Sequence, residues 1–262
     1  MRQYLAPTAP NRDGLLTVEG KDFRYMHNVL RLAGGDMVQV RFPDGTCRNM
    51  TVCAVDETAR KIILQVCAQI AYGQQSASVA LDMWLFQFVA RSAKMDVIVR
   101  QATECGVSVI VPVLGDFSQA GGAEKNFHSE RLLRIIKEAR QQSGSPVATR
   151  IVDAVPLAQA IALWLEHCAG VEEKSFAAVL YERTEETLPL HLALAGKTIA
   201  RAAVAVGAEG GISPQEIAQL RTGGFVPIHF ATNILRCETA ALYGVAAVQN
   251  AIAEKHVWLC RE

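Results

Sequence analysis

Two short segments near the end of the chain carry residue types that could bind a polar or anionic ligand. The first is the glycine loop, residues 207–211, which follows the apolar run 202–206. Ser213 suits a helix N-cap, Pro214 suits the first helical position, and Glu216 stands where a capping box requires an acid. A strand, a glycine turn and a helix start in this order present backbone N–H groups to a ligand.

The second segment, residues 234–240, reads Ile-Leu-Arg-Cys-Glu-Thr-Ala. Glu238 is typical of a helix start, because a carboxylate favours the positive end of the helix dipole. Arg236 is not explained in this way, since a cation just before a helix N-terminus opposes the dipole. An anion or a carbonyl beside Arg236 explains it better, and the alternative is a structural salt bridge with Glu238 or another acid.

Several common classes of site are disfavoured by the sequence. The glycine loop lacks the G-x-G-x-x-G spacing of dinucleotide sites and the Lys-Ser/Thr of a P-loop, so an NAD-dependent oxidoreductase or an ATP site is not expected. The seven cysteines contain no C-x-x-C pair, which indicates reduced cytosolic thiols and no zinc or other metal site. Lys and Arg equal Asp and Glu at 26 each, so any nucleic-acid surface must be local. With no secretion signal and no apolar run long enough for a membrane, we expect a cytoplasmic protein.

The elements that must position these residues change character along the chain. The first part is rich in short alternating strands and predicts a small barrel interrupted by one helix near residues 21–32. From residue 79 onward strands and helices alternate, which predicts a mainly parallel sheet with helices on both faces. The polar segment 71–76 marks the expected boundary between domains 1–72 and 73–262. Strands are expected at 37–42, 48–55, 61–66, 79–88, 107–113, 176–181, 199–206 and 225–229, and helices at 94–105, 130–142, 157–168, 214–220 and 238–254.

Five segments in the same order resemble a known family. Together they resemble the SPOUT methyltransferases and, more closely, the RsmE-type 16S rRNA uridine-N3 methyltransferases, over essentially the whole chain. The matching segments are His27-Asn28-Val29-Leu30-Arg31 with Gly35-Asp36, then Lys94-Met95-Asp96 with residues 101–107, then residues 138–144, and finally the glycine loop and residues 234–240.

The resemblance implies an α/β fold whose C-terminal SPOUT methyltransferase domain is tied in a deep trefoil knot. A small PUA-like β-barrel would precede this domain and bind RNA. The implied activity is S-adenosylmethionine-dependent methylation of uridine N3 in 16S ribosomal RNA. The implied partners are 16S rRNA or the assembled 30S subunit, and a second copy of the chain in a homodimer.

By position, three loops would surround the cofactor in this resemblance. Their expected cofactor-binding residues are Tyr181, Glu182, Gly207, Ala208, Glu209, Gly210, Gly211, Phe230, Ala231, Asn233, Ile234 and Leu235. Uridine N3 carries a proton with a pKa above neutrality, so a cation that stabilises the developing anion would help, and Arg236 is the expected catalytic residue. Glu209, Glu238 and a bound water all remain candidates for the general base.

The RNA-binding residues expected in the barrel are Arg24, His27 and Arg31. Their spacings of three, four and seven place them on one helical face, which would contact phosphates. The alternative is an ordinary solvated helix face.

The chain departs from the family pattern at several positions. Ala208 stands where Pro is usual, Asn233 and Ser145 stand where Arg is common, and residues 114–119 lack the family's Glu-Arg-Ser. Because these losses fall on the RNA side, two alternatives stay open. One is a different target nucleotide, and the other is a non-catalytic RNA-binding or ribosome-assembly protein on the same fold.

Overall fold

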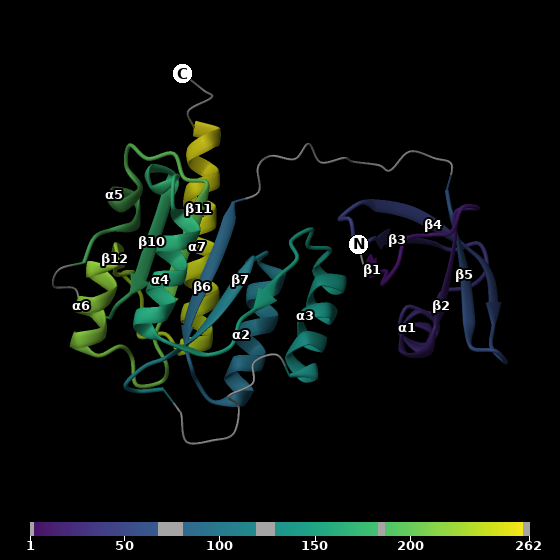
Figure 1. The fold of residues 1–262 in the computed structure, drawn as a ribbon, viewed down its shortest axis with the longest axis horizontal. Coiled ribbons are helices and arrows are strands. Elements are labelled where there is room, and N and C mark those ends of the chain that lie inside the picture. The colour runs from purple at the N-terminus through teal and green to yellow at the C-terminus, as the bar shows by residue number, and fades with distance from the viewer. Residues whose placement is uncertain (1–2, 68–80, 119–128, 183–186, 259–262) are drawn as a thin grey trace. The chain divides into compact units, whose positions relative to one another are not determined.

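The computed structural model describes residues 3–67, 81–118, 129–182 and 187–258, and the chain divides into two compact units (Figure 1). The first unit consists of Met1–Ser78 and Arg140–Pro146, and the second of Val79–Ala139 and Val147–Glu262. The expected boundary at residues 71–76 lies outside the described residues. The grouping of 140–146 with the first unit was not expected from the sequence.

The first unit is built on one five-stranded sheet with the order β1-β3-β4-β5-β2. Its strands bury alternate side chains, such as Val38 and Val40 of β3 or Ile62 and Leu64 of β5, in a single apolar core. The three expected strands are confirmed, whereas β1 and β2 were not expected. The bounds are β1 Gln3–Leu5, β2 Leu15–Glu19, β3 Met37–Arg41, β4 Cys47–Asp56 and β5 Lys61–Val66.

A buried glutamine explains why residues 140–146 belong to the first unit. Gln3 of β1 is fully buried, and its side-chain amide donates to the backbone oxygens of Arg140 at 3.0 Å and Ser145 at 3.2 Å. Its side-chain oxygen accepts from Arg41 Nε at 3.1 Å. Buried amides need such partners, so this contact holds the segment in place.

The helix expected near residues 21–32 is shorter than predicted. An α-helical turn, α1 (Gly20–Arg24), continues as a π-helical turn over Tyr25–Val29. Phe23 and Met26 are buried, as their spacing predicts. Arg31 lies beyond the helix with a φ of 54°, in the left-handed region. The expectation that Arg31 shares a helical face with Arg24 and His27 is therefore wrong, because the helix ends before it.

The second unit contains a mainly parallel sheet, as expected from the alternating pattern. The main strand order is β12-β10-β11-β6-β7-β8, β9 pairs with β7, and every recorded pair of strands in this sheet is parallel. The strands are β6 Asp82–Phe88, β7 Val109–Leu114, β8 Arg150–Ile151, β9 Val155–Pro156, β10 Ser175–Leu180, β11 Arg201–Val206 and β12 Phe225–Ile228.

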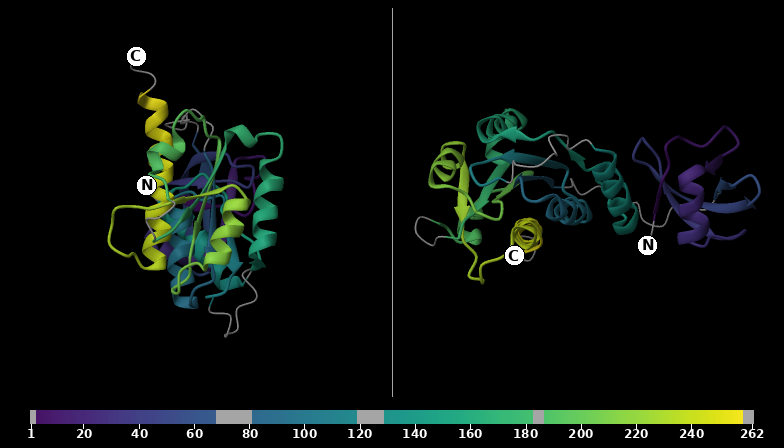
Figure 2. Two further views of the ribbon diagram at one scale, coloured as in Figure 1. Left: turned by 90° about the vertical axis from the view of Figure 1, so that its left-hand side faces the viewer. Right: turned by 90° about the horizontal axis from the view of Figure 1, so that it is seen from below.

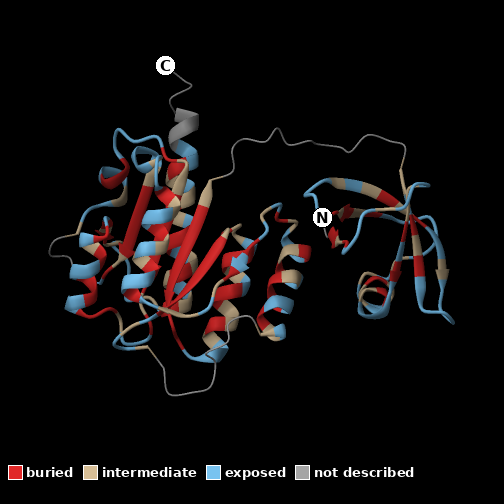
Figure 3. Cartoon of the chain, viewed as in Figure 1, coloured by how far each residue is buried: buried red, intermediate tan, exposed pale blue. Residues whose placement is uncertain are grey.

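Helices cover both faces of this sheet because its strands are apolar on both sides (Figures 2 and 3). Met83 and Leu85 of β6 belong to one core with α2, α3, α5 and α7, whereas Trp84 and Phe86 belong to the other with α4 and α6. The helices are α2 Ser92–Glu104, α3 Glu130–Ser143, α4 Leu157–Cys168, α5 Leu190–Leu194, α6 Pro214–Thr222 and α7 Cys237–Trp258. The helices expected in this part are confirmed, and only the short α5 was not expected.

The predicted capping box at the start of α6 is confirmed. The Ser213 hydroxyl accepts from the Glu216 backbone N–H, and Glu216 Oε2 accepts from the Ser213 N–H at 2.8 Å. Glu216 also accepts from the backbone N–H of Asp116 at 2.7 Å, and the Ser213 hydroxyl lies 2.6 Å from Asp116 Oδ2. One buried carboxylate thus joins the loop after β7 to the segment that follows the glycine loop.

We expect Glu216→Ala to lower the free energy of unfolding by about 3 kcal/mol, because the buried backbone N–H of Ser213 and the partly buried N–H of Asp116 lose their acceptor. Urea denaturation followed by circular dichroism measures this change. Glu166→Ala, at an exposed position on α4, is the matched control and should change the unfolding free energy by less than about 0.5 kcal/mol. Equal stability of the two variants would contradict the assigned role of Glu216.

Candidate functional site

The carboxyl ends of β10, β11 and β12 open onto a cavity of about 470 Å³. This is where parallel α/β sheets usually bind ligands. The three loops expected from the sequence meet here: the residues after β10, the glycine loop, and residues 228–237. The predicted cofactor-binding residues that line the cavity are Tyr181, Glu182, Gly207, Ala208, Glu209, Gly210, Gly211, Phe230, Asn233, Ile234 and Leu235.

Ala231 is the one predicted cofactor-binding residue that does not line this cavity. It lines a second hollow, together with residues of α5, His229 and Phe230. Ala231 precedes an exposed stretch of loop that turns back toward the first cavity at Thr232. Ala231 was predicted together with its sequence neighbours, but the local turn of the chain places it in the wall of a different hollow.

The glycine loop is closely packed and leaves little room for side chains. A Cβ atom at Gly207 would lie 2.8 Å from the Gly211 backbone, and one at Gly210 would lie 2.7 Å from Phe117. Gly211 has a φ of 81°, which favours glycine. A Cβ there would point toward Glu182, across the cavity wall, at 3.8 Å from Glu182 Oε1. The missing Cβ atoms of Gly207 and Gly210 thus allow close packing of the loop, and that of Gly211 leaves space in which a ligand can approach the backbone.

Arg236 lies at the cavity, exposed, immediately before α7. Arg236 does not form the alternative salt bridge with Glu238, whose carboxylate instead pairs with Lys94. Within the described part of the chain, no ion pair involves Arg236. Next to it, the Ile234 side chain is 91% exposed, which is unusual for a large apolar residue and consistent with a wall that a ligand covers.

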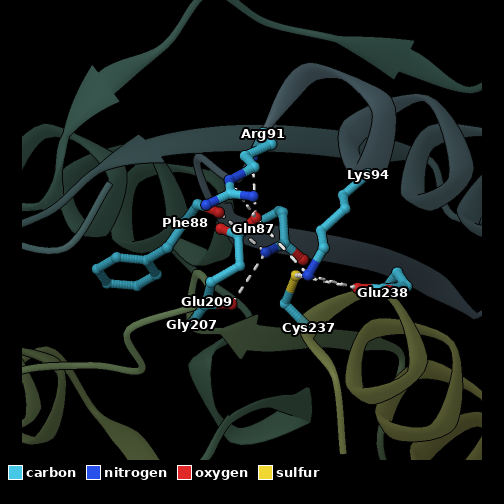
Figure 4. Close-up of polar contacts among 8 residues, drawn as sticks. All are labelled: Gln87, Phe88, Arg91, Lys94, Gly207, Glu209, Cys237 and Glu238. Atoms are coloured by element: carbon cyan, nitrogen blue, oxygen red, sulfur yellow. Dashed lines mark hydrogen bonds and ion pairs between the residues drawn. The ribbon is translucent and has the colours of Figure 1, made fainter. Parts of the chain in front are cut away.

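A charged cluster at the cavity was not identified from the sequence (Figure 4). Lys94 of α2 places its Nζ atom 3.3 Å from Glu238 Oε2 and 3.6 Å from Glu209 Oε1. It also lies 3.8 Å from the Cys237 Sγ atom. Lys94 was noted only as part of a matching segment, because nothing local in the sequence signals that it meets residues more than a hundred positions later.

The pKa values of this cluster follow from its contacts. Burial raises the pKa of Cys237 to about 11, and its hydrogen bond to Glu238 at 3.3 Å adds to the shift. The pKa of Glu238 is lowered, first by a hydrogen bond from its own backbone N–H and further by Cys237 and Lys94. Near neutral pH, Cys237 is therefore a thiol and Glu238 a carboxylate.

The expected RNA-binding residues lie in the first unit, and Arg31 lies beyond the helix that carries Arg24 and His27. Arg24 and Arg31 are exposed, but His27 faces an acid, with 3.4 Å between its Nε2 and Glu57 Oε1. His27 also stacks on Phe23 with 5.3 Å between ring centroids.

In the described residues no group of His, Cys, Asp and Glu is arranged to hold a metal, and no helix there could cross a membrane.

Comparison with known proteins decides the family. A sequence profile of the RNA methyltransferase domain matches residues 77–249. The ribosomal RNA small subunit methyltransferase E of Aquifex aeolicus (strain VF5) is 34% identical over 170 residues, which cover 64% of this chain and 69% of that protein. The chain belongs to the RsmE family of RNA methyltransferases. The resemblance seen in the sequence is therefore confirmed.

Other relatives cover more of this RsmE-family chain. The Mycobacterium bovis methyltransferase E is 25% identical over 253 residues, which cover 94% of the chain and 90% of that protein. Among solved structures, the Neisseria gonorrhoeae methyltransferase E bound to S-adenosyl methionine matches with a TM-score of 0.76 and 20% identity, covering 95% of this chain and 97% of that one. The expected α/β fold class is confirmed by this match, while the knot and the closure of the barrel stay predictions.

We expect Cys237 to react slowly with N-ethylmaleimide, because a thiol with a pKa of about 11 is scarcely ionised at pH 8. Peptide mass spectrometry after timed labelling compares it with Cys53, which is exposed. Cys53 should label at least about tenfold faster, given that the Cys237 thiolate fraction is about 100-fold below that of an ordinary thiol. In urea the two rates should converge. Equal rates in the folded protein would contradict the assigned environment.

Proposed function

We propose that this chain transfers a methyl group from S-adenosylmethionine to N3 of a uridine in 16S ribosomal RNA. The observation that carries the proposal is the meeting of three sequence-predicted loops around one cavity, in a chain of the RsmE family. The names of its relatives support a target in the RNA of the small ribosomal subunit. The choice of uridine N3 rests on the resemblance of the chain's motifs to the uridine-N3 methyltransferases.

The cavity fits S-adenosylmethionine in size and chemistry. Gly211 leaves space that a Cβ would fill, so the backbone can contact a ligand closely. Ile234 and Leu235 supply apolar wall for an adenine ring. Glu182 places a carboxylate beside the cavity, which suits a sulfonium cation. When bound, this cofactor supplies an activated methyl group.

The chain's own residues would contribute mainly by positioning and by charge. A displacement at carbon depends on holding two reactants in line, which the rigid loops of the cavity favour. Arg236, exposed at the cavity without an acidic partner in the described residues, would stabilise the negative charge that develops on the uracil ring. Two residues of the first unit, Arg24 and Arg31, would contact RNA phosphates separately, since they do not share one helical face. We also propose that two copies of this chain form a homodimer, as the family resemblance implies.

The proposal is tested with purified protein and 30S subunits from a strain that lacks the corresponding methylation. Isothermal titration calorimetry should detect S-adenosylmethionine binding, and mass spectrometry of the rRNA should find one new N3-methyluridine. A methyl group on another nucleotide would favour the alternative target. Cofactor binding without any methylation would leave an RNA-binding or assembly protein as the better account, and no cofactor binding would refute the enzymatic proposal.

We expect Arg236→Ala to lower the turnover number by about 100-fold, because a preorganised charge beside the developing anion is lost. The affinity for S-adenosylmethionine should stay within about threefold, as an exposed guanidinium next to a cationic cofactor adds little to binding. Single-turnover methylation and calorimetry measure the two effects. Arg221→Ala, on α6 and outside the cavity lining, is the control. Loss of cofactor affinity in Arg236→Ala would place this residue in the cofactor pocket instead.

A further inference from the structure

The charged cluster at the cavity contains two acids and two bases. Glu209 comes from the glycine loop, Glu238 from the first turn of α7 and Lys94 from α2, while Arg91 precedes α2 (Figure 4). Lys94 Nζ is within 4 Å of a carboxylate oxygen of each acid, and Arg91 Nε lies 4.0 Å from Glu209 Oε1. The formal charges of the four residues therefore cancel, and the question is which of the two acids is placed to act on a ligand.

The two acids are not equivalent. Glu238 does not line the cavity, it interacts with Lys94 and Cys237, and its own backbone N–H satisfies it further. Its lowered pKa makes it a weak proton acceptor. Glu209 does line the cavity. Its recorded contacts in the described chain all reach Oε1, from Lys94 at 3.6 Å and from the Arg91 backbone N–H and Nε at 3.3 and 4.0 Å. The second oxygen, Oε2, is left for a ligand.

The remaining groups of the cluster are unsuited to accept a proton. Cys237 keeps its own proton near neutral pH and donates toward Glu238. Desolvation acts to lower the pKa of Lys94, but Cys237, Glu238 and Glu209 raise it in net, so Lys94 stays charged. Arg91 is a permanent cation.

We infer that Glu209 is the residue that accepts the N3 proton of the target uridine, and that Lys94 is a positioning residue that holds the Glu209 carboxylate at the cavity. This inference rests on the proposed function. The proton of N3 passes to Glu209 Oε2, the freed electron pair of N3 bonds to the methyl carbon, and the electrons of the broken sulfur–carbon bond stay on sulfur. Atoms and charge balance without any further reactant.

The contacts of Lys94 also explain its role. Its Nζ atom lies 3.6 Å from Glu209 Oε1, and it reaches the glycine loop from a different element, α2. Because Lys94 is also fixed by Glu238 and Cys237, it holds the carboxylate of Glu209 in one place without being free to follow it into the cavity.

The test compares Glu209→Gln, Lys94→Gln and Lys94→Arg in single-turnover methylation of 30S subunits across a range of pH. Glu209→Gln should slow methyl transfer by at least about 100-fold and remove the acidic limb of the pH profile. Lys94→Gln should slow methyl transfer by about tenfold, because the Glu209 carboxylate loses an ion pair that fixes it at the cavity. Lys94→Arg should restore most of the rate.

The pH profile is interpreted with all charged groups around Glu209 in view. These are Arg91 at the N-cap of α2, Lys94 in α2, Cys237 and Glu238 from α7, and Glu182, His229 and Arg236 from the other walls of the cavity. Glu238→Gln should keep the acidic limb, because Glu209 still provides the base. Lys61→Gln, which breaks the exposed Lys61–Glu19 pair of the first unit, is the matched control for loss of a lysine–glutamate contact and should leave the profile unchanged.

Calorimetry supplies a readout that does not depend on turnover. In Glu209→Gln the dissociation constants of both S-adenosylmethionine and the neutral product S-adenosylhomocysteine should stay within about threefold. Weaker binding of S-adenosylmethionine alone would mean that Glu209 recognises the sulfonium charge, and the inference would be wrong. A Glu209→Gln variant with normal rate and acidic limb would also overturn it. If the unaltered protein neither binds the cofactor nor methylates RNA, the proposed function fails instead.

Discussion

The candidate site depends on one buried side-chain amide. Gln87, at the end of β6, donates through Nε2 to the carbonyls of Phe88 at 2.9 Å, Val206 at 3.3 Å and Gly207 at 3.2 Å (Figure 4). The last two carbonyls belong to the point where β11 ends and the glycine loop begins, at and just after the last recorded strand pair, Val206 with Gln87. A buried carbonyl without a donor costs free energy, so the amide fixes the place where the chain leaves the sheet.

The other end of the loop is fixed by a second buried polar side chain. Glu216 accepts from the backbone of Ser213 and Asp116, and so joins the start of α6 to the loop after β7. Between these two anchors the backbone of residues 207–211 has little freedom. Glu209, the one ionisable residue of the loop, is therefore held in a defined position beside Arg91, the N-cap of α2, and Lys94 of α2. The glycines supply close approach, and the anchors supply rigidity.

The sequence predicted the parts of this site that depend on local rules. The capping box of Ser213 and Glu216, the glycine loop and the helix that begins at Cys237 all follow from spacing and residue type. Lys94 could not be assigned in this way, because its partners lie in elements that only the parallel pairing of β6 and β11 brings near. β1 was missed for a similar reason, since its three residues form a strand only through parallel pairing with β3. Arg31 shows the opposite error, because a helix was predicted to include this residue although the helix ends before it.

The charges at the start of α7 leave a cation, Arg236, without an acidic partner at a position that the helix dipole disfavours. The dipole of α7 opposes a positive charge before its first turn, yet both Lys94 and Arg236 lie there. Glu238, in the first turn, offsets the dipole and is in turn paired with Lys94. The acid that would most easily neutralise Arg236 is thus already engaged. In the described residues Arg236 has no acidic partner, whereas Glu209 on another wall of the cavity is paired through Oε1 with Lys94 and Arg91. A cation without an acidic partner on one side and a carboxylate whose Oε2 has no recorded contact on another are what anion stabilisation and proton removal on a single base would require.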